Sequence, residues 1–413
     1  MTRSRLLLLL VPYALLVFPA PPVDAAHARQ DCVEDLNGDG IVNASDLAQL
    51  LSKWGETFPS TVDAVTPSSG PGLGGTAITI TGTRLAGAVA VVVGGSPAVE
   101  FAVVSSTEIT AVTPAGTAGP RNVTIITPDG PATLHDGFTY TSNGTLPWAT
   151  IIEAAPNPNV VTSAALRAAI VATELPWRVR DNASQIEMLL VPPRTFTMGC
   201  SPSSTTACDN DENPTHTVHV TQPFYLGRFE VTQQEWTEVM GSNPSLFSDL
   251  GKSPVHPVEQ VSWNMIQAFE AATNLRLPSE AEWELACRAG SSTAFNNSSN
   301  NEATIGDLAW FGACCWPPNS DDHSHPVGLK LGNALGFHDM HGNVWEWVED
   351  WYSATYYSQS PTSNPPGPST GTKRVIRGGS WYEPAGQCRS SARVGATPAV
   401  MSSKGGFRVA RTP

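Results

Sequence analysis

The chain has 413 residues, which is too long for one ordinary domain at about 150 residues per domain. Hydrophobic residues make up 41% of it, and glycine and proline number 35 each, so the composition predicts turn-rich domains with real cores rather than a helical protein. The formal charge is -14 and no run of basic residues occurs, so we expect no nucleic-acid partner, because phosphate binding needs clustered Lys and Arg.

The first segment, residues 1–28, has the pattern of a secretory signal peptide. Arg3 and Arg5 precede an apolar stretch, residues 6–18, that is too short for a membrane span. Cleavage after Ala25 or after Ala28 fits the small residues found there. No later apolar run reaches about 18 residues, so the sequence predicts no membrane span and a secreted, cell-surface or periplasmic protein.

Seven cysteines in such a compartment favour disulfides, with one cysteine left over. Cys200 and Cys208 flank a short polar loop and form the most plausible local bridge. Cys314 and Cys315 are adjacent and such pairs rarely bond each other, so we expect at least one of them to bond elsewhere. Cys287 falls in a predicted helix, where it can serve as a small buried hydrophobic residue.

Residues 29–58 contain a loop with the spacing of an EF-hand, followed by an amphipathic helix. An EF-hand loop places oxygen ligands at fixed intervals around a central glycine, which suits a calcium ion. By that spacing the ligands are Asp35, Asn37, Asp39, Ile41, Asn43 and Asp46. The segment resembles one dockerin-type EF-hand repeat. The alternative is an acidic turn that holds no metal.

Residues 59–141 consist of short β-branched runs separated by Gly- and Pro-rich turns, which predicts a small antiparallel sandwich. The expected strands cover residues 77–81, 89–93, 108–112, 122–127 and 138–140. The glycine-rich segment 65–83 resembles the immunoglobulin-like IPT/TIG module. This module offers no nucleophile, base or metal cluster, so we expect it to act as a spacer or in adhesion.

A linker and a helix over residues 160–172 are expected within segment 142–176, before a large C-terminal domain over residues 177–413. In that domain Thr232 with Glu235, and Ser279 with Glu282, form capping-box patterns that predict two helices. Glu280 and Glu284 are spaced i,i+4 on the second of these helices, so we expect them on a solvated face.

Several motifs follow one another across this C-terminal domain. They include Gly342-Asn-Val-Trp-Glu-Trp347, Arg377-Gly-Gly-Ser-Trp381 and Gly405-Gly-Phe-Arg408, together with segments 188–199, 223–232 and 276–284. In this order they closely resemble the formylglycine-generating enzyme family, also called sulfatase-modifying factors. The resemblance implies a C-type-lectin-related α+β fold with little regular secondary structure and many buried tryptophans. The whole chain is thus expected to combine this fold with an Ig-like sandwich and one EF-hand-like loop and helix.

The resemblance also implies where an oxidase site would lie. Family members with that activity hold copper between two cysteines that follow the serine of the Gly-Gly-Ser motif. Here that serine is Ser380, and the two positions hold Glu383 and Cys388, so Cys388 and Ser380 are the candidate catalytic residues. A soft cuprous ion prefers thiolates, so a carboxylate at one position predicts an incomplete copper site. Cys388 itself has three interpretations: half of a disulfide, a buried structural thiol, or a ligand or nucleophile.

A structural calcium ion is a further implication of the resemblance. In the family it is held by a side chain at the position of Asp339, by the backbone carbonyls of Gly342 and Val344, and by the carboxylate of Glu346. The alternative for Glu346 is a cap or an ion pair inside a tryptophan-lined core.

The histidines offer little as ligands of another metal. His216 and His219 fall on opposite faces of an expected strand and cannot chelate jointly, whereas His323 and His325 share a face if the chain is extended. Relatives that bind iron with three histidines use a His-x-x-x-His pattern, which is absent here, so such an iron enzyme is not expected.

Two functions follow from these observations. The favoured one is a divergent, calcium-stabilised binding or accessory domain of a secreted multi-module protein, with a protein, peptide or glycan as its ligand. The alternative is a formylglycine-generating oxidase that converts a cysteine in a sulfatase Cys-x-Pro-x-Arg segment with copper and dioxygen.

Overall fold

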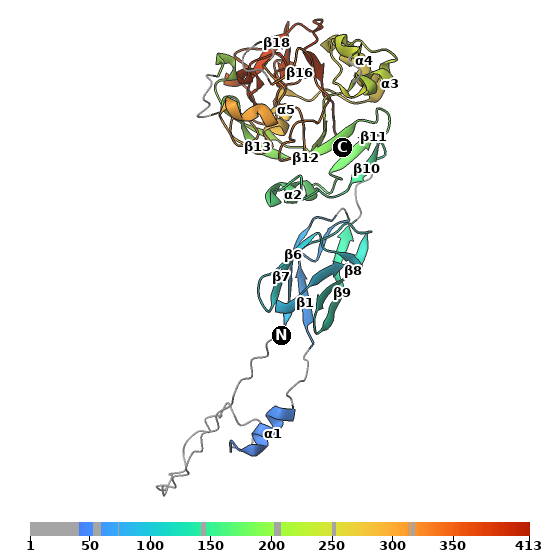
Figure 1. Ribbon diagram of the computed structural model, residues 1–413, viewed down its shortest axis with the longest axis vertical. Coiled ribbons are helices and arrows are strands. Elements are labelled where there is room, and N and C mark those ends of the chain that lie inside the picture. Colours follow the sequence, from blue (N-terminus) through green and yellow to red (C-terminus); the bar gives the residue numbers. More distant parts are fainter. Residues whose placement is uncertain are drawn as a thin grey trace, which may run out of the picture. The chain divides into compact units, whose positions relative to one another are not determined.

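The computed structural model describes residues 41–52, 59–72, 74–141, 146–201, 208–249, 253–312, 314 and 319–413. The expected signal peptide and the proposed calcium ligands Asp35, Asn37 and Asp39 lie outside these residues. The expectation of a multidomain, sheet-rich chain with few helices is confirmed (Figure 1). Among the described residues, no helix combines the length and the apolar character needed to cross a membrane.

The first compact unit, residues 1–58, contributes one described helix, α1 (Ala44–Ser52). Its start is fixed by a local hydrogen-bond pattern in which the Asp46 carboxylate accepts from the backbone N–H of Asn43 at 2.7 Å. The Asn43 side chain in turn accepts from the backbone N–H of Ser45 at 2.7 Å. Both are the side-chain acceptors that stabilise a helix N-terminus. The helix expected after the loop is therefore present, and calcium binding there stays a prediction.

Residues 59–141 form a sandwich of two sheets, with strand orders β1-β3-β7-β6 and β2-β9-β8-β4-β5. All five predicted strands are present, and the structure adds four short or edge strands. The strands are β1 (Thr61–Thr66), β2 (Ser69–Pro71), β3 (Ala77–Thr83), β4 (Ala90–Val93), β5 (Ser96–Pro97), β6 (Glu100–Val103), β7 (Glu108–Val112), β8 (Gly119–Thr127) and β9 (Gly130–Thr141). In β3, Ile78 and Ile80 are buried and their neighbours are more exposed, which is the period-two pattern of a strand with one buried face.

The first sheet of the C-terminal region includes a strand from the segment expected to be a linker. Residues 149–153, expected in a linker, form β10 (Ala149–Glu153), which pairs with β11 (Arg178–Asp181). The helix that follows, α2 (Ala164–Val171), is capped by Ser163 and buries Leu166 in the same core. The sheet continues through β12 (Glu187–Val191), β15 (Phe224–Gly227) and β20 (Ala410–Arg411) in the order β10-β11-β12-β15-β20.

A second sheet carries the family motifs. Its strands are β16 (Trp345–Trp351), β17 (Arg374–Arg377), β18 (Arg393–Ala396) and β19 (Gly405–Phe407), in the order β18-β17-β16-β19. A hairpin of β13 (Arg194–Met198) and β14 (His216–Val220) and the helices α3 (Gln233–Met240), α4 (Trp263–Thr273) and α5 (Glu280–Arg288) pack around these sheets. The short 3-10 turns are η1 (Leu85–Gly87), η2 (Asn210–Glu212), η3 (Leu246–Asp249), η4 (Ser253–Val255), η5 (Glu302–Asp307), η6 (Tyr356–Ser358) and η7 (Ala385–Cys388).

Both predicted capping boxes are present. The Thr232 side chain accepts from Glu235 N at the start of α3, and the Ser279 side chain accepts from Glu282 N at the start of α5. In each case the glutamate reaches back to the backbone of the capping residue, so two orphan donors are satisfied together. The expected buried tryptophans are present as well, with Trp177, Trp236, Trp283, Trp345, Trp347 and Trp381 all in the interior.

Candidate functional site

The candidate site is the loop from Ser380 to Cys388, which connects β17 to β18. Two glycines with positive φ, Gly378 (92°) and Gly379 (77°), turn the chain as it leaves β17. A Cβ atom on Gly379 would lie 2.5 Å from the sulfur of Cys388, so the close approach of the two ends of the loop depends on this glycine. The loop is thus a closed turn that ends in η7, with Cys388 on its inner side.

Cys388 is a free thiol with no exposed surface. Its sulfur lies 3.9 Å from the carbonyl oxygen of Pro384. Burial, with the nearby charge of Glu383, raises the pKa of the Cys388 thiol far above its ordinary value. Cys388 is thus a free, fully buried thiol in this structure, which fits the interpretation of a buried structural thiol and not that of half of a disulfide.

Glu383 occupies the other cysteine position and points to a different partner. Its carboxylate lies 3.9 Å from the ammonium of Lys404, and its side chain is 25% exposed. Lys404 in turn lies 3.4 Å from the ring centroid of Tyr382, a cation–π contact. The first cysteine position therefore holds a partly exposed carboxylate in a surface ion pair. This pair of residues does not fit a two-thiolate copper site.

Ser380 is buried, and its hydroxyl accepts a hydrogen bond from the backbone N–H of Tyr382 at 3.3 Å. The Ser380 carbonyl accepts from Glu383 N at 3.1 Å, and the Glu383 carbonyl accepts from Gly312 N at 2.7 Å. Ser380 therefore shapes the loop, and its hydroxyl is engaged with the backbone of the loop itself.

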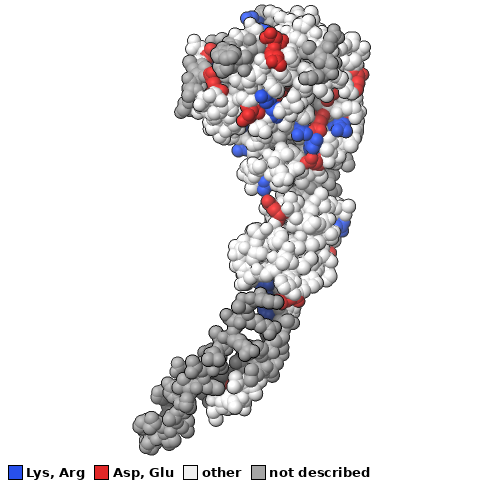
Figure 2. Space-filling view, in the orientation of Figure 1, with Lys and Arg blue, Asp and Glu red and all other residues white. Residues whose placement is uncertain are grey.

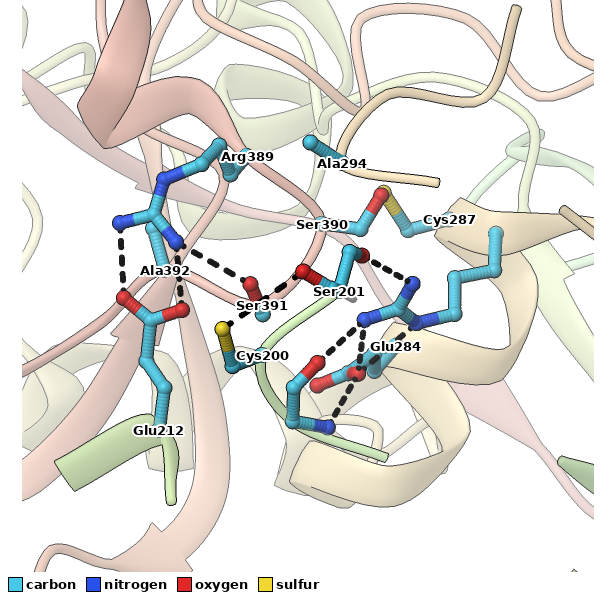
Figure 3. A network of polar contacts seen from close by, with 12 residues as sticks. Cys200, Ser201, Glu212, Glu284, Cys287, Ala294, Arg389, Ser390, Ser391 and Ala392 are labelled. Atoms are coloured by element: carbon cyan, nitrogen blue, oxygen red, sulfur yellow. Dashed lines mark hydrogen bonds and ion pairs between the residues drawn. The ribbon is translucent and has the colours of Figure 1, made fainter. Parts of the chain in front are cut away.

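The segment that follows Cys388 is anchored by buried ion pairs (Figure 3). Arg389 donates to both carboxylate oxygens of Glu212, at 2.5 and 2.7 Å, and also to the hydroxyl of Ser391. The same arginine hydrogen-bonds the carbonyl of Gly386 inside the loop at 2.7 Å. Bidentate arginine pairs combine energy with fixed geometry, so this contact holds the second half of the loop in place.

The expectation of a solvated face for Glu280 and Glu284 is wrong. Both side chains are buried, and Glu284 pairs with Arg288 at 2.8 Å and with Arg377. Glu280 receives both a 2.7 and a 2.8 Å hydrogen bond from Arg393. The arginines that neutralise these carboxylates come mostly from strands β17 and β18, over 90 residues away in sequence, so local helix spacing could not reveal them.

The structure confirms Cys287 as a buried residue. Its sulfur lies 3.5 Å from the hydroxyl of Ser390, and burial raises the pKa of the thiol to about 12. The bridge between Cys200 and Cys208 is present as predicted. Cys314 is disulfide-bonded as well, so it is not a free thiolate that could complete a copper site with Cys388.

Of the residues that resemblance assigns to calcium, Glu346 has other partners in this structure. Glu346 is buried and accepts two hydrogen bonds from Arg408, both of 2.6 Å, and one from the Trp283 indole at 2.7 Å. Three donors leave its oxygens well satisfied, which matches the ion-pair alternative for Glu346. Gly342 (φ 80°) and Val344 use their N–H groups, on Gly378 O and the Glu230 carboxylate respectively.

Asp339 keeps one feature of a cation ligand. It is buried with φ of 57°, and its Oδ2 accepts from Gly328 N at 2.7 Å, whereas its Oδ1 is buried without a hydrogen-bond partner among the described residues. Burial, together with the charge of Glu346, raises the pKa of Asp339 to about 6. Burial and the charges of Asp339 and Glu346 raise the pKa of Glu230 well above its usual value. Calcium binding here stays a prediction. The free oxygen of Asp339 fits it, whereas the ion-paired carboxylate of Glu346 does not.

The histidines behave as the strand geometry predicts. His219 bonds the Thr195 hydroxyl at 2.7 Å and His216 packs against the ring of Tyr357, so the two have separate partners. His323 and His325 lie together, with ring centroids 5.1 Å apart. Burial, with the neighbouring His323, lowers the pKa of His325 to about 4. Sequence reasoning missed the carboxylate of Asp321 beside them, although Asp321 precedes His323 by the same two-residue step that separates the two histidines.

Taken together, the fold and the loop define a sulfatase-modifying-factor-type domain preceded by an Ig-like module. Residues 175–413, more than half of the chain, match the sulfatase-modifying factor enzyme 1-like domain family, and residues 60–142 match the IPT/TIG domain. The chain belongs to the sulfatase-modifying factor enzyme 1-like family.

Relatives in this family carry different names. The formylglycine-generating enzyme of Streptomyces coelicolor is 38% identical over 189 residues, covering 42% of this chain and 60% of that protein. The chaperone protein LppX of Paenibacillus barcinonensis is 31% identical over 210 residues, covering 38% of this chain and 69% of that protein. Among solved structures, PvdO from Pseudomonas aeruginosa aligns with a TM-score of 0.50 at 30% identity, over 57% of this chain and 98% of PvdO. The chain spans about three fifths of the two bacterial formylglycine-generating enzymes it matches, at 60% and 59%.

Proposed function

We propose that the C-terminal domain is a divergent, non-oxidase member of its family that acts as a binding or accessory domain. One observation carries this proposal: the loop has a partly exposed carboxylate, Glu383, and a fully buried thiol, Cys388, at the two positions where copper would need thiolates. A hard carboxylate is a poor ligand for Cu(I), so the loop offers one thiol, which solvent does not reach, where the copper site needs two.

The outer side of the same loop offers a surface suited to a ligand. Tyr382 is 38% exposed and packs edge-on against Trp381, with ring centroids 5.6 Å apart. Beside it stand the opposite charges of Glu383 and Lys404. An amphipathic aromatic ring flanked by charges is common where proteins bind peptides or glycans. The expected ligand is therefore a protein, peptide or glycan.

Proteins that match this chain carry other names besides formylglycine-generating enzyme. A relative that shares this domain is named a chaperone protein, and other matching proteins are named serine/threonine-protein kinases. Figure 2 shows acidic and basic side chains interspersed over the face in view, as on a surface that binds by local complementarity. We place the protein outside the cytoplasm, with the IPT/TIG module as a spacer and calcium as a stabilising ion, on the basis of the sequence patterns.

Anaerobic titration with Cu(I) tests the proposal. Wild-type protein is expected to take up no stoichiometric thiol-bound copper, and Cys388→Ser should behave like the wild type. Tight one-to-one binding that disappears in Cys388→Ser would overturn the proposal. Loss of soluble protein in Cys388→Ser is checked by its melting curve, and Cys388→Ala provides a second variant of similar size.

The second candidate function, a formylglycine-generating oxidase acting on a sulfatase segment, is favoured by the free thiol of Cys388 at a family cysteine position. It requires Cys388 to become accessible and ionised when the substrate binds. Conversion of a Cys-x-Pro-x-Arg peptide to formylglycine, dependent on Cys388, would establish it.

A further inference from the structure

A carboxylate and two imidazoles meet in the irregular segment before Gly328. The ligand atoms of Asp321, His323 and His325 all lie within 4.8 Å of one another. In the part of the chain that the structure describes, this is the one group of three or more His, Cys, Asp or Glu side chains close enough to hold a metal ion together. It is distinct from the positions of Glu383 and Cys388.

The surrounding structure places the two histidines on one side and holds the ring of His325. The intervening Ser324 is fully buried, so the alternation of the chain places His323 and His325 on the same side, with their rings inclined by 29°. The backbone N–H of His325 donates to the Asn343 side chain at 2.9 Å, and its ring stacks on Trp310 with centroids 3.8 Å apart. Both contacts orient the imidazole before any ion arrives, which lowers the ordering cost of binding.

The three side chains have unused coordination capacity. Nε2 of His325 is buried and, among the described residues, has no hydrogen-bond partner. The Asp321 carboxylate makes no hydrogen bond or ion pair with either imidazole, although all three residues are described. A buried ring nitrogen without a partner is costly, and a metal ion would satisfy it.

We propose that Asp321, His323 and His325 bind a divalent transition-metal ion of the zinc type. Two imidazoles and one carboxylate are a ligand set that zinc and its neighbours accept, and two nitrogen ligands discriminate against calcium and magnesium. With metal–ligand bonds of about 2.1 Å, tetrahedral ligand atoms lie about 3.4 Å apart, so small side-chain rotations complete the site. Three protein ligands leave at least one position open to water or to a ligand group.

The site is connected to the loop that follows Ser380. The ring of Phe247 lies 5.9 Å from that of His323 and 5.7 Å from that of Trp381. The hydroxyl of Ser320, next to Asp321, donates to the carbonyl of Trp381 at 2.6 Å. An ion at the triad is therefore adjacent to the residues that support the binding surface, yet its existence does not depend on the chemistry of that loop.

Metal binding is tested with untagged, full-length protein that has been stripped with a chelator and then titrated with Zn²⁺ or Co²⁺ in excess Ca²⁺. We expect one Zn²⁺ per chain by calorimetry, d–d absorption bands of tetrahedral or five-coordinate Co²⁺, and no competition by Ca²⁺. Asp321→Asn, His323→Ala and His325→Ala should each weaken binding by at least about 100-fold, more than the loss of an outer-shell contact.

Matched controls separate the triad from other groups. Asp322→Asn removes the adjacent exposed carboxylate, and His219→Ala removes a histidine of β14, and both should retain wild-type affinity. Unchanged melting curves in the absence of metal show that each variant folds. Binding that survives all three triad substitutions, that is displaced by Ca²⁺, or that is absent from the wild type would overturn the proposal.

Discussion

Replacing Arg408 by methionine should strongly destabilise the C-terminal domain. Arg408 is fully buried and donates to both oxygens of Glu346, as well as to the carbonyls of Gly227 and His338, each at 3.0 Å. Methionine fills much of the volume but leaves the Glu346 carboxylate buried and without its cation. Removing one partner of a buried ion pair typically costs about 3–5 kcal/mol of unfolding free energy.

The neighbouring charges place the expected loss toward the upper end of that range. Glu230 and Asp339 are also buried carboxylates, and the Arg408 charge opposes the rise of the pKa of both. For a domain of this size, a loss of 3–5 kcal/mol lowers the melting temperature by roughly 10 °C. Calorimetry or a thermal melt followed by circular dichroism measures it. The double variant Arg408→Met with Glu346→Met should recover most of the loss, because an apolar pair can replace a buried ion pair.

A calcium ion bound at this position would change the result. Suppose that the free energy of unfolding of Arg408→Met lies within about 1 kcal/mol of the wild-type value in Ca²⁺ but not in EDTA. The ion, and not the arginine, then neutralises Glu346. An equally small loss of stability in EDTA would refute the view that Arg408 is needed to neutralise the buried carboxylate of Glu346.

Three further outcomes are expected. Burial raises the folded-state pKa of Glu259 from 4.5 to about 7, so the free energy of unfolding should fall as pH rises between these values. Urea unfolding of Glu259→Gln should lack this contribution to the pH dependence, which is at most ~3 kcal/mol. An identical pH profile in the variant would contradict the assignment. Replacing Cys200 and Cys208 by alanine opens a loop of sequence separation 8 and should cost about 2–3 kcal/mol in denaturant unfolding, whereas no change would argue against a stabilising bridge. Glu383→Cys should restore a thiol pair with Cys388 and gain stoichiometric Cu(I) binding, and Glu383→Ser should not; failure of the cysteine variant to bind would show that the loop has left the geometry of a copper site.

Local patterns predicted local structure well. The strands of the sandwich and the capping boxes of α3 and α5 follow from alternation and from side-chain acceptors only a few residues away. The Cys200–Cys208 bridge closes a short loop and could therefore be predicted from the spacing of the two cysteines alone. By contrast, β10 lies in a segment whose composition predicts a linker, and only its partner β11 makes it a strand.

The contacts of the candidate site were harder to predict, because the residues that make them are distant in sequence. Glu284 sits on a helix with the spacing of an exposed residue, yet Arg377 of β17 neutralises it in the interior. Glu383 was identified by position, but its pairing with Lys404 needed the fold. Asp321, His323 and His325 follow one another at every second residue, but only the fold shows that their ligand atoms meet.

The most direct test of the central claim is the mass of a Cys-x-Pro-x-Arg peptide after incubation with the purified protein, copper, dioxygen and a thiol reductant. We expect an unchanged cysteine mass, alike for the wild type and for Cys388→Ser, under conditions in which a bacterial formylglycine-generating enzyme converts the peptide. Formation of formylglycine by the wild type, lost in Cys388→Ser, would contradict it.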